Sequence, residues 1–391
     1  MLSIFALSTV PLVMVLSNSM LIPFLPALQR EMNLDPLEVG LVITAFSLPA
    51  GTVIPLSGFL ADRWGRKLVL VPALLLFGLG GLLSGLAASL PRPSFPGLIA
   101  ARVLQGLGGG GTYQIAMALA GDLSPPERRP KHLGLLESSN GLGKVAAPIL
   151  GSALSLVVWW LPFFLYPLLA WLSALVVALT VPEPGKKKEA PLPYFRHSLQ
   201  LLRKNASEIS AVFAGGMICL FTLFGSLTHF TDVLESRFGI RDLAKGLVIA
   251  LPVLALALTS YLGGKELGSR LRELARPVST AGMLLLALAL GVASWKAASF
   301  FWLVGALTAA GAGTGLALAT YSGLVTGLSG AEQRGLLTAL YGTVRFLGAA
   351  LGPPLAGKTG EATLPLLGLL ALGGAGLGHL LLKSSARSRA T

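Results

Sequence analysis

Uncharged or nearly uncharged runs of about 20 residues recur along this chain, and they constrain its fold more than any other feature. A helix needs roughly that length to cross a lipid bilayer. We place spans near residues 4–29, 37–58, 68–90, 96–120, 132–155, 159–181, 209–231, 244–264, 277–296, 298–326, 334–357 and 362–382. The sequence therefore predicts an all-α membrane protein with 12 transmembrane helices.

The composition excludes a soluble protein and argues against several functions. Only 12% of residues are charged and the mean hydropathy is +0.75, whereas a soluble surface needs about twice that charge density. The net charge of +13 falls in short loops and forms no basic stripe, so we expect no nucleic-acid partner. The single cysteine, Cys219, and four dispersed histidines predict no metal site. Because no assembled catalytic signature is present, we expect neither an enzyme nor a cofactor.

One long polar interval divides the chain into two sets of six spans. Residues 182–208 open with Pro-Glu-Pro-Gly-Lys-Lys-Lys-Glu and are too polar to cross a bilayer. We predict an N-terminal six-helix bundle at 1–181, a cytoplasmic linker at 182–208 and a C-terminal six-helix bundle at 209–391. Within the linker, Tyr194–Lys204 has apolar and basic residues on different sides, which favours an amphipathic helix on the membrane surface.

The distribution of basic residues predicts the orientation. With both termini in the cytoplasm, the inside segments hold 20 Lys and Arg and the outside segments hold 7. Cytoplasmic loops carry an excess of Lys and Arg. We therefore expect a multi-pass protein of the cell (inner) membrane with both termini cytoplasmic. We also expect it to be a monomer surrounded by membrane lipids.

The two halves repeat each other. Asp122–Arg129 and Gly327–Arg334 align at an offset of 205, and the same offset places Gly143 on Gly348 and Pro148 on Pro353. Parallel repeats related by an axis normal to the membrane are a transporter architecture with a site near mid-membrane. The repeat predicts two pseudo-symmetric bundles that face each other across such a site.

A short polar loop, Gly58–Lys67, joins the second and third spans. Its sequence Gly-Phe-Leu-Ala-Asp-Arg-Trp-Gly-Arg-Lys resembles the loop between helices 2 and 3 that marks the major facilitator superfamily, and the chain resembles that family over nearly its whole length. In that family the loop's Asp and Arg join an acid at the end of helix 4 in a charge cluster that holds the outward-open state. The resemblance implies a conformational latch made of Gly58, Asp62, Gly65, Arg66 and Asp122.

The fourth span carries a guanidinium, Arg102, inside the hydrocarbon region. This costs at least about 2.5 kcal/mol unless the group is paired or hydrated. Arg102-Val-Leu-Gln-Gly106 resembles the family's helix-4 motif, whose arginine is linked to proton coupling; a purely structural arginine bonded to backbone carbonyls is the alternative. The following run Gly106–Gly111 lacks the ending of a phosphate loop and suits close helix packing.

The fifth span resembles the helix-5 motif of the antiporter branch of the family. Gly143, Pro148 and Gly151 match that motif, while Ala147 replaces the usual glycine and Lys144 occupies a normally small or apolar position. Small residues and a proline shape a bend against a neighbouring helix. This resemblance implies a drug:proton antiporter-like transporter.

Polar residues on the fifth span and one cation on span 11 are candidates for cargo binding. Glu137, Asn140, Lys144 and Pro148 share one helix face, and Arg345 corresponds by the offset to Asn140. Lys144 and Arg345 together could recognise an anionic group. Alternatively, both cations form structural links between helices. Glu137 and Lys144 lie about 10.5 Å apart along the axis, so each needs another partner.

We expect a secondary active transporter, with proton-coupled efflux of amphipathic or organic compounds by alternating access. Transport of an anionic metabolite or lipid through Lys144 and Arg345 is the alternative, and a receptor or enzyme that has reused the fold is a further rival. Multidrug antiporters of the resembled family typically carry an acid in the middle of helix 1 or helix 4, and its absence here weakens a cationic-drug interpretation. The proton-coupling candidates are Arg102, Glu137, His229 and Asp232, and the substrate-binding candidates are Asn18, Gln114, Asn140, Lys144, Tyr341 and Arg345.

Overall fold

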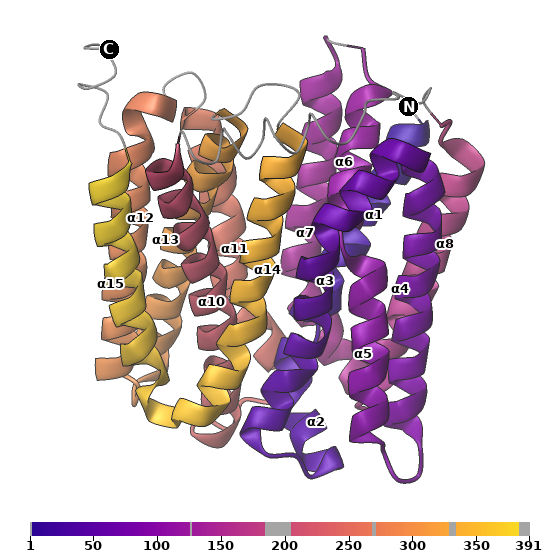
Figure 1. Ribbon diagram of the computed structural model, residues 1–391. Coiled ribbons are helices and arrows are strands. Elements are labelled where there is room, and N and C mark those ends of the chain that lie inside the picture. The colour runs from indigo at the N-terminus through magenta and orange to yellow at the C-terminus, as the bar shows by residue number, and fades with distance from the viewer. Residues whose placement is uncertain (1, 126, 184–204, 268–270, 328–333, 383–391) are drawn as a thin grey trace. The chain divides into compact units, whose positions relative to one another are not determined.

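The computed structural model describes residues 2–125, 127–183, 205–267, 271–327 and 334–382 (Figure 1). All regular secondary structure in these ranges is helical. The elements are α1 (Leu2–Ser19), η1 (Ile22–Phe24), α2 (Leu25–Met32), α3 (Pro36–Trp64), α4 (Arg66–Ser89), α5 (Phe95–Gly109), α6 (Thr112–Asp122), α7 (Arg129–Ser155), α8 (Leu161–Thr180), α10 (Ala206–Ser236), α11 (Asp242–Leu267), α12 (Leu271–Trp295), α13 (Phe300–Gly327), α14 (Arg334–Thr359), η3 (Gly360–Ala362) and α15 (Thr363–Leu381).

Each of the predicted spans coincides with a helix or with consecutive helices, so the all-α prediction is confirmed. Within the described residues, 9 helical stretches are long and apolar enough to cross a membrane. One of them, Leu337–Leu381, contains both α14 and α15. Two predicted spans are not among these stretches. One is formed by α5 and α6, two shorter helices separated by a break, and the other is α7, which carries the polar stripe.

The prediction of one continuous helix at 96–120 is wrong in detail. The helix breaks at Gly110, whose ψ of 119° is extended, and at Gly111, whose φ of +83° favours glycine. A Cβ at Gly110 would lie 2.6 Å from the carbonyl oxygen of Ala50 on α3. The glycine run therefore serves close packing, as predicted, and also interrupts the helix.

The chain forms two compact units, and their boundaries differ from a single division at the middle of the sequence. One unit contains Met1–Glu189 and Thr231–Ala250, and the other contains Ala190–Phe230 and Leu251–Thr391. The end of α10 and the start of α11 thus belong with the first unit. The boundaries at 181 and 209 stay predictions, because most of the linker, including the amphipathic helix predicted at Tyr194–Lys204, lies outside the described residues.

Glycines bring the helices of the first unit into backbone contact. In this unit α4 packs against α5 and α8, and α1 packs against α7 and α8. A Cβ at Gly80 on α4 would collide with the backbone of Gln105 on α5, and one at Gly108 would collide with that of Phe77. Small residues allow membrane helices to approach this closely. In the second unit, α12 packs against α13 and α15.

Candidate functional site

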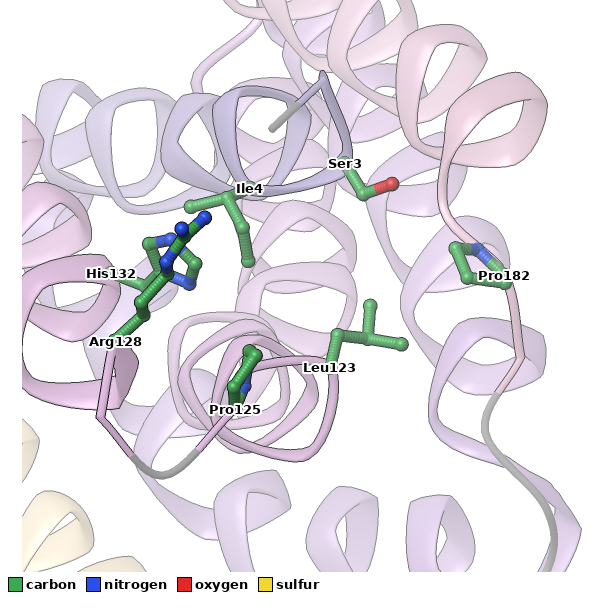
Figure 2. A pocket seen from close by; sticks show the side chains of 7 residues that line it. All are labelled: Ser3, Ile4, Leu123, Pro125, Arg128, His132 and Pro182. Carbon is green, nitrogen blue, oxygen red and sulfur yellow. The ribbon is translucent and has the colours of Figure 1, made fainter.

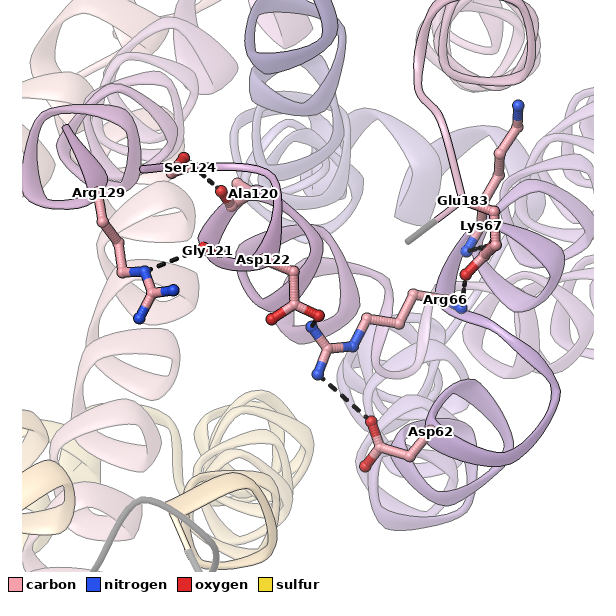
Figure 3. A network of polar contacts seen from close by, with 9 residues as sticks. All are labelled: Asp62, Arg66, Lys67, Ala120, Gly121, Asp122, Ser124, Arg129 and Glu183. Atoms are coloured by element: carbon pink, nitrogen blue, oxygen red, sulfur yellow. Dashed lines mark hydrogen bonds and ion pairs between the residues drawn. The ribbon is translucent and has the colours of Figure 1, made fainter. Parts of the chain in front are cut away.

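The structure brings together the three charged residues of the predicted latch (Figure 3). Arg66 Nη1 donates to Asp122 Oδ2 at 2.5 Å, and Arg66 Nη2 lies 3.5 Å from Asp62 Oδ1. The side chains of Asp62 and Asp122 are 65% and 38% exposed. We call Asp62, Arg66 and Asp122 the Asp62 cluster; because it is well exposed, solvent screens its charges.

Glu183 is a member of this region that the sequence analysis missed. Its carboxylate accepts from the backbone N–H groups of Arg66 and Lys67, both at 2.8 Å (Figure 3). It also accepts from the backbone N–H of Leu68 at 3.3 Å. These donors are the free N–H groups at the start of α4, where an anion is favoured. The available signal was an acid between two prolines immediately after span 6.

The two glycines of the loop differ in their roles. Gly65 ends α3 with a φ of +121°, and a Cβ there would lie 3.0 Å from the Glu183 carboxylate. Gly65 therefore allows both the turn and the approach of Glu183. A Cβ at Gly58 would meet nothing within 4 Å, so no close backbone approach occurs at Gly58 among the described residues.

Arg102 is fully buried, and its guanidinium is bonded to neutral groups on three helices. Nη2 donates to Asn18 Oδ1 at 2.7 Å, Nη1 donates to Gln105 Oε1 at 2.6 Å and to Ser17 Oγ at 3.3 Å, and Nε donates to the Val42 carbonyl at 3.2 Å. These bonds join α5 to α1 and α3. They favour the structural alternative for Arg102, while its role in proton coupling stays a prediction.

Asn18, a predicted cargo-binding residue, is part of this buried network. Its oxygen accepts from Arg102, and its Nδ2 donates to Ser47 Oγ at 2.5 Å. The Asn18 side chain is therefore committed to protein partners. Phe46 covers the other side of the guanidinium, with the ring centroid 4.8 Å from Arg102 Cζ.

The helix-5 motif residues lie where α7 packs against α1. A Cβ at Gly143 would collide with Val15, and one at Gly151 would collide with the carbonyl oxygen of Met20. Pro148 is buried within α7. A Cβ at Gly246 on α11 would lie 2.6 Å from the Pro148 carbonyl oxygen. The start of α11 therefore packs against the motif as well.

The polar stripe on α7 has partners that the sequence analysis did not identify. Tyr113 on α6 donates a hydrogen bond to Glu137, and Asn140 Nδ2 donates to the Pro11 carbonyl at 3.3 Å. Glu137 is exposed, while Asn140 and Lys144 are half-buried. Gln114 is half-buried on α6. Cargo binding by these residues stays a prediction.

Arg345 lies on α14 in the second unit and is less completely satisfied than Arg102. Its Nε is buried and has no hydrogen-bond partner among the described residues. Its guanidinium lies over the ring of Tyr341, with Cζ 5.5 Å from the centroid. A face of the guanidinium is thus held by an aromatic ring while a donor is left unused. This is a suitable arrangement for an anionic ligand.

A second charge cluster, which the sequence analysis missed, lies at the opposite end of α3 from the Asp62 cluster. Lys245 Nζ donates to Glu235 Oε2 at 2.8 Å, Arg30 pairs with Glu235 Oε1, and Arg241 Nε lies 3.7 Å from the same oxygen. We call these residues the Glu235 cluster. The side chains of Glu235 and Lys245 are only 7% and 6% exposed.

The Glu235 cluster was missed because the seventh span was predicted to end at residue 231. The helix α10 continues to Ser236 and buries Glu235 at its last turn. The predicted coupling residues His229 and Asp232 are half-buried on the same helix. Asp232 interacts electrostatically with both Lys245 and Glu235.

Comparison with known sequences agrees with this architecture. The family model described as Major Facilitator Superfamily matches residues 7–353 and also 230–385. The chain is 38% identical over 357 residues to the Bacillibactin exporter of Bacillus subtilis (strain 168), covering 90% of this chain and 88% of the relative. It is also 25% identical over 222 residues, 55% of each chain, to the Quinolone resistance protein NorA of Staphylococcus aureus (strain MRSA252).

Two solved structures share the fold. A bacterial homolog of the human lysosomal transporter Spinster, in an inward-facing and unoccupied conformation, matches with a TM-score of 0.80 at 17% identity and covers 97% of this chain and 96% of that one. The human organic anion transporter MFSD10 (TETRAN) matches with a TM-score of 0.75 at 20% identity and covers 98% and 99%. At these identities the likeness shows the fold alone.

Proposed function

Because the chain belongs to the major facilitator superfamily, a family of membrane transporters, we propose that it exports an organic small molecule from the cell by proton-coupled alternating access. The observation that carries this proposal is the 38% identity to an exporter over 90% of the chain. The similarity to NorA over a shorter region supports efflux as well. Bacillibactin is therefore the first cargo to test.

A second candidate concerns the chemistry of the cargo. The buried Nε of Arg345, which has no partner in the part of the chain that the structure describes, and the aromatic support from Tyr341 favour a cargo with an anionic group. Arginine offers a planar fork that binds carboxylate or phosphate through two hydrogen bonds. Lys144, half-buried on α7, is the second cation that we assign to cargo recognition.

Alternating access requires contacts that close one end of the transporter at a time, and two charge clusters are suited to this role. The Asp62 and Glu235 clusters lie at opposite ends of α3, a helix of 29 residues and therefore about 43 Å long. In the proposed cycle the Asp62 cluster breaks when the cytoplasmic end opens, and the Glu235 cluster breaks when the outer end opens. This assignment uses the orientation predicted from Lys and Arg, with both termini cytoplasmic.

Proton coupling is assigned to carboxylates of the first unit. Asp232 is half-buried and interacts electrostatically with Lys245 and Glu235, so its charge is linked to the cluster at that end. Glu137, bonded to Tyr113, is the other candidate. Replacement of Asp232 with Asn is expected to abolish pH-driven uptake while cargo exchange at equal pH continues.

Flux into proteoliposomes tests the proposal. Purified protein is reconstituted, a pH gradient is imposed, and uptake of bacillibactin, an organic anion, a neutral dye and a quinolone is measured. We expect gradient-dependent uptake of bacillibactin that collapses when a protonophore is added. No gradient-dependent uptake of any compound by protein that is shown to be folded would contradict export, and movement of a labelled anionic lipid instead would indicate a flippase.

A further inference from the structure

A cavity of about 230 Å³ opens at the end of the first unit that carries the Asp62 cluster (Figure 2). Its walls come from the start of α1, the segment between α6 and α7, the first turn of α7 and the residues after α8. Pockets that enclose drug-sized ligands are usually about 300–1,000 Å³. The cavity therefore suits a headgroup or a small ion better than a whole organic cargo.

One wall of the cavity carries two nitrogen-bearing side chains, Arg128 and His132, which lie side by side (Figure 2). His132 Nδ1 lies 2.7 Å from Ser124 Oγ, and Ser124 donates its only hydroxyl proton to the Ala120 carbonyl at 2.5 Å. The imidazole must therefore donate from Nδ1, which leaves Nε2 for a ligand. The Arg128 guanidinium makes no hydrogen bond or ion pair with the residues that the structure describes.

Apart from Ser3, whose hydroxyl donates to the Thr180 carbonyl at 2.7 Å, the rest of the cavity is apolar and adjoins an apolar surface. Ile4, Leu123 and Pro182 contribute aliphatic walls. Beside Ile4 on α1, Leu2 and Phe5 are 67% and 64% exposed, as expected of side chains that contact lipid chains in a membrane protein. A ligand that fits both parts has an anionic head and an apolar tail.

The surrounding charge favours an anion at this position. The segment that carries Arg128 also carries Arg129 and Lys131 against one further acid, Glu127, and the acid at its start, Asp122, is already paired with Arg66. Basic pockets between transmembrane helices at the membrane surface bind the headgroups of anionic lipids.

We propose that this cavity binds the phosphate headgroup of an anionic phospholipid. Arg128 donates to the phosphate oxygens, His132 Nε2 accepts from a headgroup hydroxyl, and the first acyl carbons lie against Ile4 and Leu123. Phosphatidylglycerol, whose glycerol headgroup carries hydroxyls, is the probe that matches this arrangement. The proposal does not depend on the identity or the direction of the transported cargo.

Native mass spectrometry of the purified full-length chain tests this site. Phosphatidylglycerol is titrated against wild-type protein, Arg128→Gln and the matched control Arg129→Gln. Arg129 is adjacent in sequence, but its Nε donates to the Gly121 carbonyl at 3.0 Å and its side chain does not line the cavity. Phosphatidylcholine and inorganic phosphate are titrated in parallel, and thermal unfolding in phosphatidylcholine shows that each variant is folded.

We expect wild type and Arg129→Gln to retain one phosphatidylglycerol and Arg128→Gln to bind it about fivefold to tenfold more weakly. Equal weakening of phosphatidylglycerol binding in both variants would mean that only the general surface charge matters, and it would overturn the site. Equal retention by all three proteins would overturn it too. Binding of inorganic phosphate as tight as that of phosphatidylglycerol would assign the cavity to a free anion and overturn the lipid.

Discussion

Two arginines embedded in the helices, Arg102 and Arg345, show how differently a membrane protein can accommodate a guanidinium. Arg102 is completely buried, bonded to two amide oxygens, a hydroxyl and a carbonyl, and covered by Phe46. Arg345 is half-buried, rests on Tyr341 and leaves its Nε without a partner among the described residues. Charge inside a membrane is costly unless it is compensated. The difference supports our proposal that Arg102 has a structural role and that Arg345 is available to bind cargo.

Removal of Arg102 tests the structural side of this comparison and has the largest expected effect. In Arg102→Met, the buried oxygens of Asn18 and Gln105 lose their donors, and each unsatisfied group costs about 1–3 kcal/mol. For the two groups together we expect a loss of about 2–6 kcal/mol in unfolding free energy, seen as a much lower midpoint in thermal unfolding of the purified protein. A variant as stable as wild type would show that the network does not hold α5 to α1 and α3.

The Glu235 cluster extends the comparison to a buried ion pair. Glu235→Gln leaves Lys245 buried beside a neutral group, and we expect a loss of about 3–5 kcal/mol in unfolding free energy. The double variant Glu235→Gln with Lys245→Met removes the stranded charge and should recover most of that loss. Thermal unfolding of the single and double variants measures the coupling. Additive losses would mean that the two side chains act independently.

Arg345→Gln tests the other side of the comparison through function. Loss of charge-assisted hydrogen bonds worth about 1.5–3 kcal/mol predicts a roughly 10-fold to 100-fold fall in uptake of an organic anion. Unfolding free energy should change by less than about 1 kcal/mol, because the Nε of the lost guanidinium has no partner among the described residues. Arg345→Lys keeps the charge and loses the fork, so we expect it to retain part of the uptake.

Glu183→Ala has the smallest expected effect, since it removes an exposed cap and no buried charge. Three backbone N–H groups of α4 lose their acceptor, which corresponds to about 1 kcal/mol for a helix cap. Glu127→Ala, in the nearby segment between α6 and α7, is the matched control and should leave the unfolding midpoint unchanged. Equal shifts of the unfolding midpoint in both variants would show that Glu183 does not specifically stabilise the start of α4.

Much of the fold could be predicted from the sequence because the signals are long and local. Apolar runs of span length located the helices, and the Gly58–Lys67 loop was recognisable because its residues are contiguous. The break at Gly110 and Gly111 was not predicted, since hydropathy does not record backbone torsion angles.

The partners of charged residues were harder to predict, because they come from distant parts of the chain. Glu183 is 117 residues from Arg66, and Glu235 is 205 residues from Arg30. Glu235 also lies beyond the predicted end of its span. The hydropathy pattern therefore predicted a loop position for an acid that is buried in α10. For Arg345 the sequence supplied the charge and its depth, whereas only the structure shows the unused donor.

The most direct test of the account is uptake of an organic anion and of a neutral dye, measured side by side in proteoliposomes that contain wild type or Arg345→Gln in folded form. The account predicts that the variant loses at least about 90% of anion uptake, a tenfold effect, while uptake of the neutral dye continues. Equal uptake of the anion by both proteins would contradict the assignment of Arg345 to cargo recognition.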